Sequence, residues 1–128
     1  MANSAEFVAH CLDLLAPLGQ VRARRMFGGH GVYLDDLFIA LVVDETLYLK
    51  ADDTSRSQFE QGGCQPFRYR TQDQRTVSLD YRSAPGDAME SPGLMRPWAR
   101  LAQASALRSA AAKRGPRKSA RTGRADRR

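Results

Sequence analysis

The sequence has few residues from which a metal centre or a disulfide framework could be built. It contains two cysteines, Cys11 and Cys64, and two histidines, His10 and His30. Two cysteines are too few for a disulfide framework, and a zinc site would need all four residues to converge. His10 and Cys11 adjoin on a predicted helix and point about 100° apart, so they form no nucleophile pair by themselves. We therefore expect reduced thiols, with Cys11 in the core and Cys64 in a loop or at a strand start, and we expect no metal or cofactor.

Long hydrophobic runs are also scarce. The longest, Leu37–Val43, has seven residues, far below the roughly 18 to 20 residues that cross a membrane. The N-terminal stretch MANSAEF lacks the basic and apolar regions of a signal peptide. These features predict a cytoplasmic protein with no membrane partner.

The excess positive charge is confined to the C-terminal end. The 128-residue chain has a net charge of +6, from 20 Lys and Arg and 14 Asp and Glu. Eight of the basic residues and one acid fall in 113–128, which leaves twelve basic and thirteen acidic residues in 1–112. We expect one folded domain over 1–112 and a tail over 113–128 that is disordered, or helical only to about Arg114.

The tail has the composition of a segment that contacts phosphate groups without reading sequence. Its candidate nucleic-acid-binding residues are Lys113, Arg114, Arg117, Lys118, Arg121, Arg124, Arg127 and Arg128. A tail that only solubilises the domain is the alternative.

Three segments have helical spacing. In the first, Phe7, Cys11 and Leu14 share a face, Ser4 is the expected N-cap, and Pro17 follows as a stop signal. The second is a short helix over 52–63, capped by Asp52 or Asp53, with Phe59 pointing inward. The third begins near Ser91, and its apolar face consists of Leu94, Trp98, Leu101 and Ala104, followed by Leu107 or Arg108. Pro97 is either the first residue of this helix or the point at which a kink separates two helices.

Strand patterns fill the rest of the chain. Turn residues at 28–29, 35–36 and 44–45 divide Val21–Ala51 into four antiparallel strands. Leu37–Val43 lacks polar alternation and is expected to be the central strand, buried on both faces. A hairpin follows, with Phe67 and Tyr69 on one face and Val77, Leu79 and Tyr81 inward. The acids at the turns and caps bond local amides, so we predict no pair of catalytic carboxylates.

The glycine-rich stretch GGHG does not match a phosphate-binding loop. Such a loop needs G-x-G-x-x-G between a strand and a helix, whereas here another strand pattern follows. We expect Gly28 and Gly29 to supply positive φ for a turn or bulge and Gly31 to admit a close neighbour.

The arginines before this stretch, Arg22, Arg24 and Arg25, have two interpretations. Charge on an exposed edge strand discourages unwanted strand pairing. The same three residues are also our candidate partner-binding patch. A platform for single-stranded nucleic acid could combine Tyr69 with Arg68 and Arg70, although strand alternation points Tyr69 away from both arginines.

Several longer blocks carry a family resemblance. They are LG, RRMFGG followed by GVY, LYLK, and PF-x-Y, within a segment of roughly residues 7 to 106. The segment resembles the TfoX N-terminal domain of the bacterial TfoX/Sxy competence regulators. The resemblance implies an α+β domain in which helices pack on a curved antiparallel sheet of about five to six strands, similar to secretion-chaperone-like domains. The family has no catalytic residues that could be assigned to this sequence. Full-length regulators of the family carry a second, helical domain, where this sequence has the basic tail.

Two classes of function remain from the sequence. The first is a non-enzymatic regulatory or interaction protein that binds a protein partner. This partner could be a second copy of the chain, joined through the sheet as a homodimer, and the tail would add non-specific affinity for nucleic acid. The second is a small-molecule-binding domain or an unrecognised enzyme that uses the concave face of the sheet. Convergent polar groups with shifted pKa values would favour the second class, and an apolar surface patch would favour the first.

Overall fold

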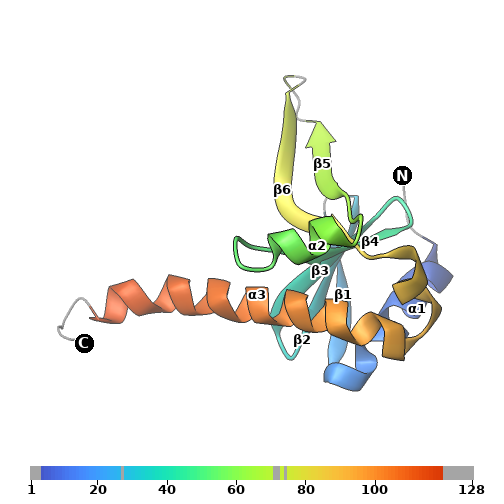
Figure 1. Cartoon of the computed structure of the whole chain (residues 1–128), viewed down its shortest axis with the longest axis horizontal. Helices are drawn as coiled ribbons and strands as arrows, with labels where there is room; N and C mark the ends of the chain where they lie inside the picture. Colours follow the sequence, from blue (N-terminus) through green and yellow to red (C-terminus); the bar gives the residue numbers. More distant parts are fainter. Residues whose placement is uncertain (1–3, 27, 71–72, 74, 120–128) are drawn as a thin grey trace.

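The fold is α+β, as the sequence predicts. The computed structural model describes residues 4–26, 28–70, 73 and 75–119. Its antiparallel sheet has six strands in the order β1-β2-β3-β4-β6-β5 and is not closed. Along the chain the elements are α1 (Ala5–Leu15), a 3-10 turn (Ala16–Leu18), β1 (Val21–Met26), β2 (Gly29–Leu34), β3 (Leu37–Val43), β4 (Thr46–Lys50), α2 (Arg56–Gln61), β5 (Pro66–Arg70), β6 (Thr76–Ser83), a second 3-10 turn (Gly86–Glu90) and α3 (Pro92–Ser119) (Figure 1).

The first four strands are joined by tight turns at the predicted positions. Asp35 and Asp36 have φ of 48° and 68°, and Asp44 and Glu45 have φ of 53° and 58°. Two successive residues with positive φ are the mark of the hairpin turn whose twist matches that of the strands. Gly28 also has a positive φ, of 75°, but the same expectation for Gly29 is wrong because Gly29 already belongs to β2.

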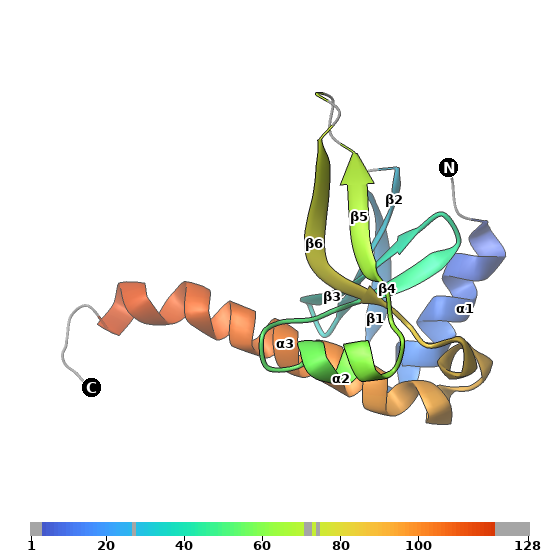
Figure 2. The same cartoon turned by 45° about the horizontal axis from the view of Figure 1, so that its top comes forward.

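The core lies between one face of the sheet and the helices. α3 packs on β3, β4 and α1, and α1 packs on β1 and β2 (Figure 2). Ser4 caps α1 as predicted, since its hydroxyl accepts a hydrogen bond from the Phe7 amide at 3.1 Å. Phe59 and Cys11 are fully buried in this core, which confirms their predicted positions.

The buried face of α3 is only partly the predicted one: Trp98 and Leu101 pack against the core as expected. Leu94 and Leu107 are exposed, and the fully buried side chains are Met95, Ala99, Ala102 and Ser105. Both sets have helical spacing, so spacing alone did not select between them. Three of these side chains, Ala99, Ala102 and Ser105, are small and let α3 approach the sheet closely, whereas leucines at those positions would hold it away.

Three predicted helix boundaries are also wrong. α3 is one helix from Pro92 to Ser119, so Pro97 neither begins it nor separates two helices, and the helix passes the expected end near Arg114. Pro92 is instead the first helical residue, where a missing N–H has no helical partner, and the run of alanines at 110–112 favours continuation. In α2 the N-cap is Ser55 rather than Asp52 or Asp53, because the Asp52 carboxylate accepts from the Thr54 and Ser55 amides and forms a turn ahead of the helix.

A bulge in β3 determines which of its side chains point away from the core. Val32 pairs with Ala40 and Tyr33 with Phe38, so Ile39 has no partner in this register. Ile39 and Ala40 therefore both belong to the core. Phe38 and Leu41, on either side of them, line a cavity on the opposite face. The prediction that this strand is central is confirmed, but its burial on both faces is only partly so, because Phe38 and Val43 on the cavity side are half-buried.

Candidate functional site

The open face of the sheet is the candidate site. Within the described part of the chain, α1, α2 and α3 lie on the other face (Figure 2). Strand register brings six aromatic side chains together on the open face. We call them the aromatic face: Tyr33, Phe38, Tyr48, Phe67, Tyr69 and Tyr81.

The aromatic face consists of two groups of contacting rings. The Phe38 ring lies 5.1 Å from Tyr33 and 6.1 Å from Tyr81, measured between centroids. In the second group, the Phe67 ring lies 4.9 Å from Tyr48 and 6.1 Å from Tyr69. These separations lie in the range of favourable aromatic pairs.

The predicted inward direction is wrong for Leu79, which is 39% exposed and shares the open face with Tyr69, 42% exposed. Tyr81 lies on the same face but is buried, and the side chain of Val77 lies outside the described residues. Alternation along a strand predicted correctly that Phe67 and Tyr69 lie together. Alternation does not say which face the helices cover, and here the helices cover the other one.

A cavity of about 440 Å³ opens on the aromatic face. Met26 on β1 and Tyr69 on β5 both line it, although β1 and β5 are the two edges of the sheet. The sheet is therefore curved, as expected. Gly31 makes room for two cavity side chains, because a Cβ there would lie 2.8 Å from Met26 Cε and 3.1 Å from Phe38 Cε1, which confirms the close approach predicted for this glycine.

The lining of the cavity is mostly apolar. Leu41, Val43 and Leu79 join the aromatic rings, and the polar lining residues are His30, Asp44 and Arg68. Burial, with the neighbouring Tyr33, raises the pKa of Tyr81 to about 12, so its hydroxyl keeps its proton at neutral pH. A mainly apolar lining and a protonated phenol suit binding better than acid–base catalysis.

The three predicted partner-patch arginines divide between the two sides of the sheet. Arg22 pairs with Tyr33 and Arg24 with Gly31, so both belong to the open face. Arg25 pairs with His30 and lies on the other side. All three are exposed and β1 is an edge strand, which agrees with the predicted position at an exposed edge.

Two cations contact the aromatic face directly. The Arg22 guanidinium lies 4.5 Å from the centroid of the Tyr33 ring and 3.5 Å from an Asp36 carboxylate oxygen. Lys50 Nζ lies 5.0 Å from the centroid of the Tyr81 ring. Burial is the main cause that lowers the pKa of Lys50, and Lys113 lowers it further, while Asp80 and Asp52 act in the opposite direction.

Sequence reasoning missed Tyr48 and Lys50 as members of a functional surface. The alternation of TLYLK does place both opposite Leu47 and Leu49. The missing information was the pairing of β4 with β6, which lies far along the chain. Of the proposed nucleic-acid platform, Arg68 and Tyr69 line the same cavity, and the side chain of Arg70 lies outside the described residues.

Most of the basic tail lies beyond what the structure describes. Lys113 is exposed on α3. Arg114, Arg117 and Lys118 fall within the helix, but their side chains lie outside the described residues. Arg121, Arg124, Arg127 and Arg128 lie outside them entirely.

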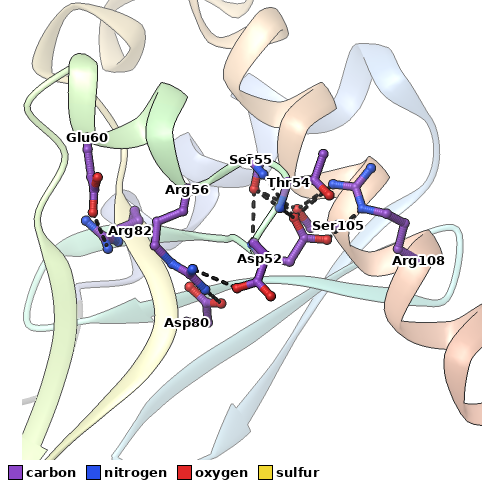
Figure 3. A network of polar contacts seen from close by, with 10 residues as sticks. Asp52, Thr54, Ser55, Arg56, Glu60, Asp80, Arg82, Ser105 and Arg108 are labelled. Atoms are coloured by element: carbon purple, nitrogen blue, oxygen red, sulfur yellow. Dashed lines mark hydrogen bonds and ion pairs between the residues drawn. The ribbon is translucent and has the colours of Figure 1, made fainter.

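A second polar cluster joins α3 to the loop before α2 (Figure 3). The Arg108 guanidinium donates to both Asp52 carboxylate oxygens at 2.6 and 3.0 Å. Asp52 also bonds Ser55, whose buried hydroxyl lies 3.1 Å from that of Ser105. The Arg108 hydrogen bond holds the pKa of Asp52 well below its usual range. Each carboxylate oxygen of Asp52 is already engaged by neighbouring groups, so we assign this cluster to holding α3 in place.

The cysteines and histidines do not converge. Burial raises the pKa of the Cys11 thiol to about 12, with a smaller contribution from Glu45, and burial also raises the pKa of the Cys64 thiol. His10 Nε2 lies 2.8 Å from the Met89 carbonyl oxygen. Among the described residues, no group of three or more His, Cys, Asp or Glu side chains could hold a metal ion. No described helix is long and apolar enough to span a bilayer.

These observations define a class of protein: a small α+β domain with helices on one face of a curved sheet and an open, aromatic binding face on the other. The chain belongs to the TfoX N-terminal domain family, whose model matches residues 13–106. That match confirms the resemblance carried by the sequence blocks.

Two relatives match shorter segments. An uncharacterized 12.7 kDa protein from the trpE 5′ region of Spirochaeta aurantia is 35% identical over 60 residues, which are 47% of this chain and 52% of the relative. The DNA transformation protein TfoX1 of Aliivibrio fischeri (strain ATCC 700601 / ES114) is 36% identical over 57 residues, which are 44% of this chain and 27% of that protein. The match thus spans about half of one relative and about a quarter of the other.

Proposed function

We propose that this chain is a non-enzymatic regulatory or interaction protein of the TfoX kind, which acts in the cytoplasm by binding a protein partner. The observation that carries the proposal is the β1 edge of the sheet, an exposed edge strand that presents three arginines. The name of the Aliivibrio fischeri relative, a DNA transformation protein, supports a role connected with DNA transformation.

The β1 edge is the surface we assign to the protein partner. Arg22, Arg24 and Arg25 are exposed there, and an edge strand leaves backbone N–H and C=O groups unpaired. Arginine is enriched at protein interfaces because its planar group binds carboxylates in pairs. An acidic partner surface, or a second copy of the chain joined along the sheet, fits this edge.

The basic tail supplies the nucleic-acid contribution to the proposed function. Its seven net charges would give a log–log salt slope of roughly −5 to −6 on duplex DNA if most of them engage phosphates. Such contacts raise affinity for any sequence and do not select one.

Anisotropy of a labelled duplex across a salt series tests the tail, and sedimentation of the full chain tests self-association. The full-length variant R121Q/R124Q/R127Q/R128Q should weaken duplex binding. It should also reduce the magnitude of the log–log salt slope by about 0.9 for each of the four arginines removed. The charge-reversal variant R22E/R24E/R25E should abolish association with an acidic partner or a second copy. Duplex affinity that is equal in the wild type and the tail variant would overturn the tail assignment.

A second function is favoured by one observation, the cavity. Its volume of about 440 Å³ lies within the range of small-molecule sites, roughly 300 to 1,000 Å³. If the domain binds a small apolar ligand, the cavity-filling variant Leu79→Trp should abolish binding of an apolar dye such as ANS. Equal dye binding by the wild type and this variant would remove the small-molecule hypothesis.

A further inference from the structure

We propose that the aromatic face is a stacking platform for single-stranded nucleic acid, separate from the phosphate contacts of the tail. The inference goes beyond the proposed function and does not depend on it. It rests on the placement of an exposed ring, its half-buried aromatic neighbours and cationic side chains on the same open face of the sheet.

One exposed ring and its half-buried neighbours provide the stacking surface. Tyr69 is 42% exposed, and its ring continues the row formed by Phe67 and Tyr48. Bases in a single strand present their flat faces, so successive rings on a sheet can each stack one base without regard to sequence. In a duplex those faces are covered by neighbouring base pairs, so the platform selects single strands.

Cations lie where the phosphates of a stacked strand would run. Arg22 and Arg24 are on the β1 side of the face, and Lys50 is in its middle beside Tyr81. Arg68 also lines the cavity, although strand register places it on the other side of β5 from Tyr69. The site therefore spans the sheet from β1 to β5, which suits an extended polyanion.

The carboxylates on this side do not cancel that charge. Asp36 lies 3.5 Å from Arg22, and Asp44 lines the cavity, so two acids oppose the three basic side chains Arg22, Arg24 and Lys50. A lysine in the middle of the surface also argues against a protein occupant, because lysine is depleted at the centre of protein interfaces. The charge balance thus favours a polyanion.

The test uses the full chain and a fluorescein-labelled oligo(dT) of about 12 nucleotides, a length within the usual site size of such surfaces. Anisotropy is measured for the wild type, Tyr69→Ala, Tyr69→Phe and the tail variant R121Q/R124Q/R127Q/R128Q. Leu107→Ala is the matched control, because Leu107 is also an exposed apolar side chain, 52% exposed, but lies on α3. Circular dichroism verifies that each variant folds.

We expect Tyr69→Ala to raise the Kd for oligo(dT) at least about 5-fold, the loss of one stacked base. Tyr69→Phe and Leu107→Ala should leave the Kd unchanged, and duplex binding should be insensitive to Tyr69→Ala. The tail variant should weaken duplex binding more than oligo(dT) binding, so failure of the tail assignment and failure of the platform give different patterns.

Photocrosslinking locates the strand independently. A 5-iododeoxyuridine oligonucleotide should crosslink to Tyr48, Phe67 or Tyr69, as read by mass spectrometry of the digested full chain. Crosslinks only within 113–128, or an oligo(dT) Kd that does not change in Tyr69→Ala, would overturn the proposal. Loss of self-association in Tyr69→Ala with unchanged oligo(dT) binding would also overturn it and would assign the face to a second copy of the chain.

Discussion

Adjacent glycines at the start of β2 should respond very differently to the same substitution. Gly28 lies in the turn with φ of 75°, and a Cβ there meets nothing within 4 Å. Gly29 has no positive φ, but a Cβ there would lie 3.0 Å from Val43 Cγ2 and closer still to the Val42 carbonyl oxygen. The first position is limited by conformation and the second by space.

The two costs follow from these geometries. A left-handed alanine costs about 1 to 2 kcal/mol, and the reduced freedom of the unfolded chain returns about 0.4 to 1 kcal/mol of this. Gly28→Ala should therefore lower the free energy of unfolding by about 1 kcal/mol. At Gly29 the obstacle is backbone of the central strand, so β2 and β3 must separate. Overpacking costs about 1 to 3 kcal/mol and strained ladder hydrogen bonds about 1 kcal/mol each, which gives about 3 kcal/mol or more.

Urea denaturation measures both variants with one probe. Trp98 is the only tryptophan and its ring lies 5.7 Å from that of Phe59 in the core, far from the altered turn along the chain. We expect a difference of about 2 kcal/mol, or about 30-fold in the unfolding equilibrium constant. If Gly28→Ala costs as much as Gly29→Ala, the close approach of β2 to β3 does not explain why glycine stands at position 29.

Three other expectations concern the core, the polar cluster and the thiols. Phe59→Ala should cost about 3 to 5 kcal/mol in urea denaturation followed by circular dichroism, because Phe59 is fully buried; a loss below about 1 kcal/mol contradicts its place in the core. The pKa of Asp52 is depressed by Arg108, so its stabilising contribution is complete above the unfolded pKa of about 4 and is lost as pH falls below it. Asp52→Asn should therefore show a smaller fall in Tm below pH 4 than the wild type, and parallel curves would argue against the pair. In a Cys64→Ser variant, the buried Cys11 thiol, whose pKa is about 12, should react with DTNB at pH 8 only after urea is added; rapid reaction in the native state would contradict its burial.

The wrong predictions share a physical origin. Local spacing places side chains on a common face of one element, and it did so correctly for Phe67 with Tyr69 and for Cys11 with the buried face of α1. It does not state which of two faces another element covers. For α3, the approach distance to the sheet favoured Ala99 and Ala102 over the larger Leu94 and Leu107.

The candidate site depended even more on tertiary structure. Tyr48 and Lys50 became neighbours of Tyr81 through the pairing of β4 with β6, and no local pattern sets that pairing. The bulge at Ile39 turned Phe38 and Leu41 toward the cavity, which a regular strand with alternating sides would have prevented.

The sequence by itself determined the family, the α+β class, the turn positions and the place of charge in the chain, because blocks of residues, turn chemistry and composition are local properties. The tertiary structure decided which sheet face stays open and which rings and cations share it. Those outcomes depend on strand order, register and the packing distance of α3, and each of these joins residues that are far apart in the chain.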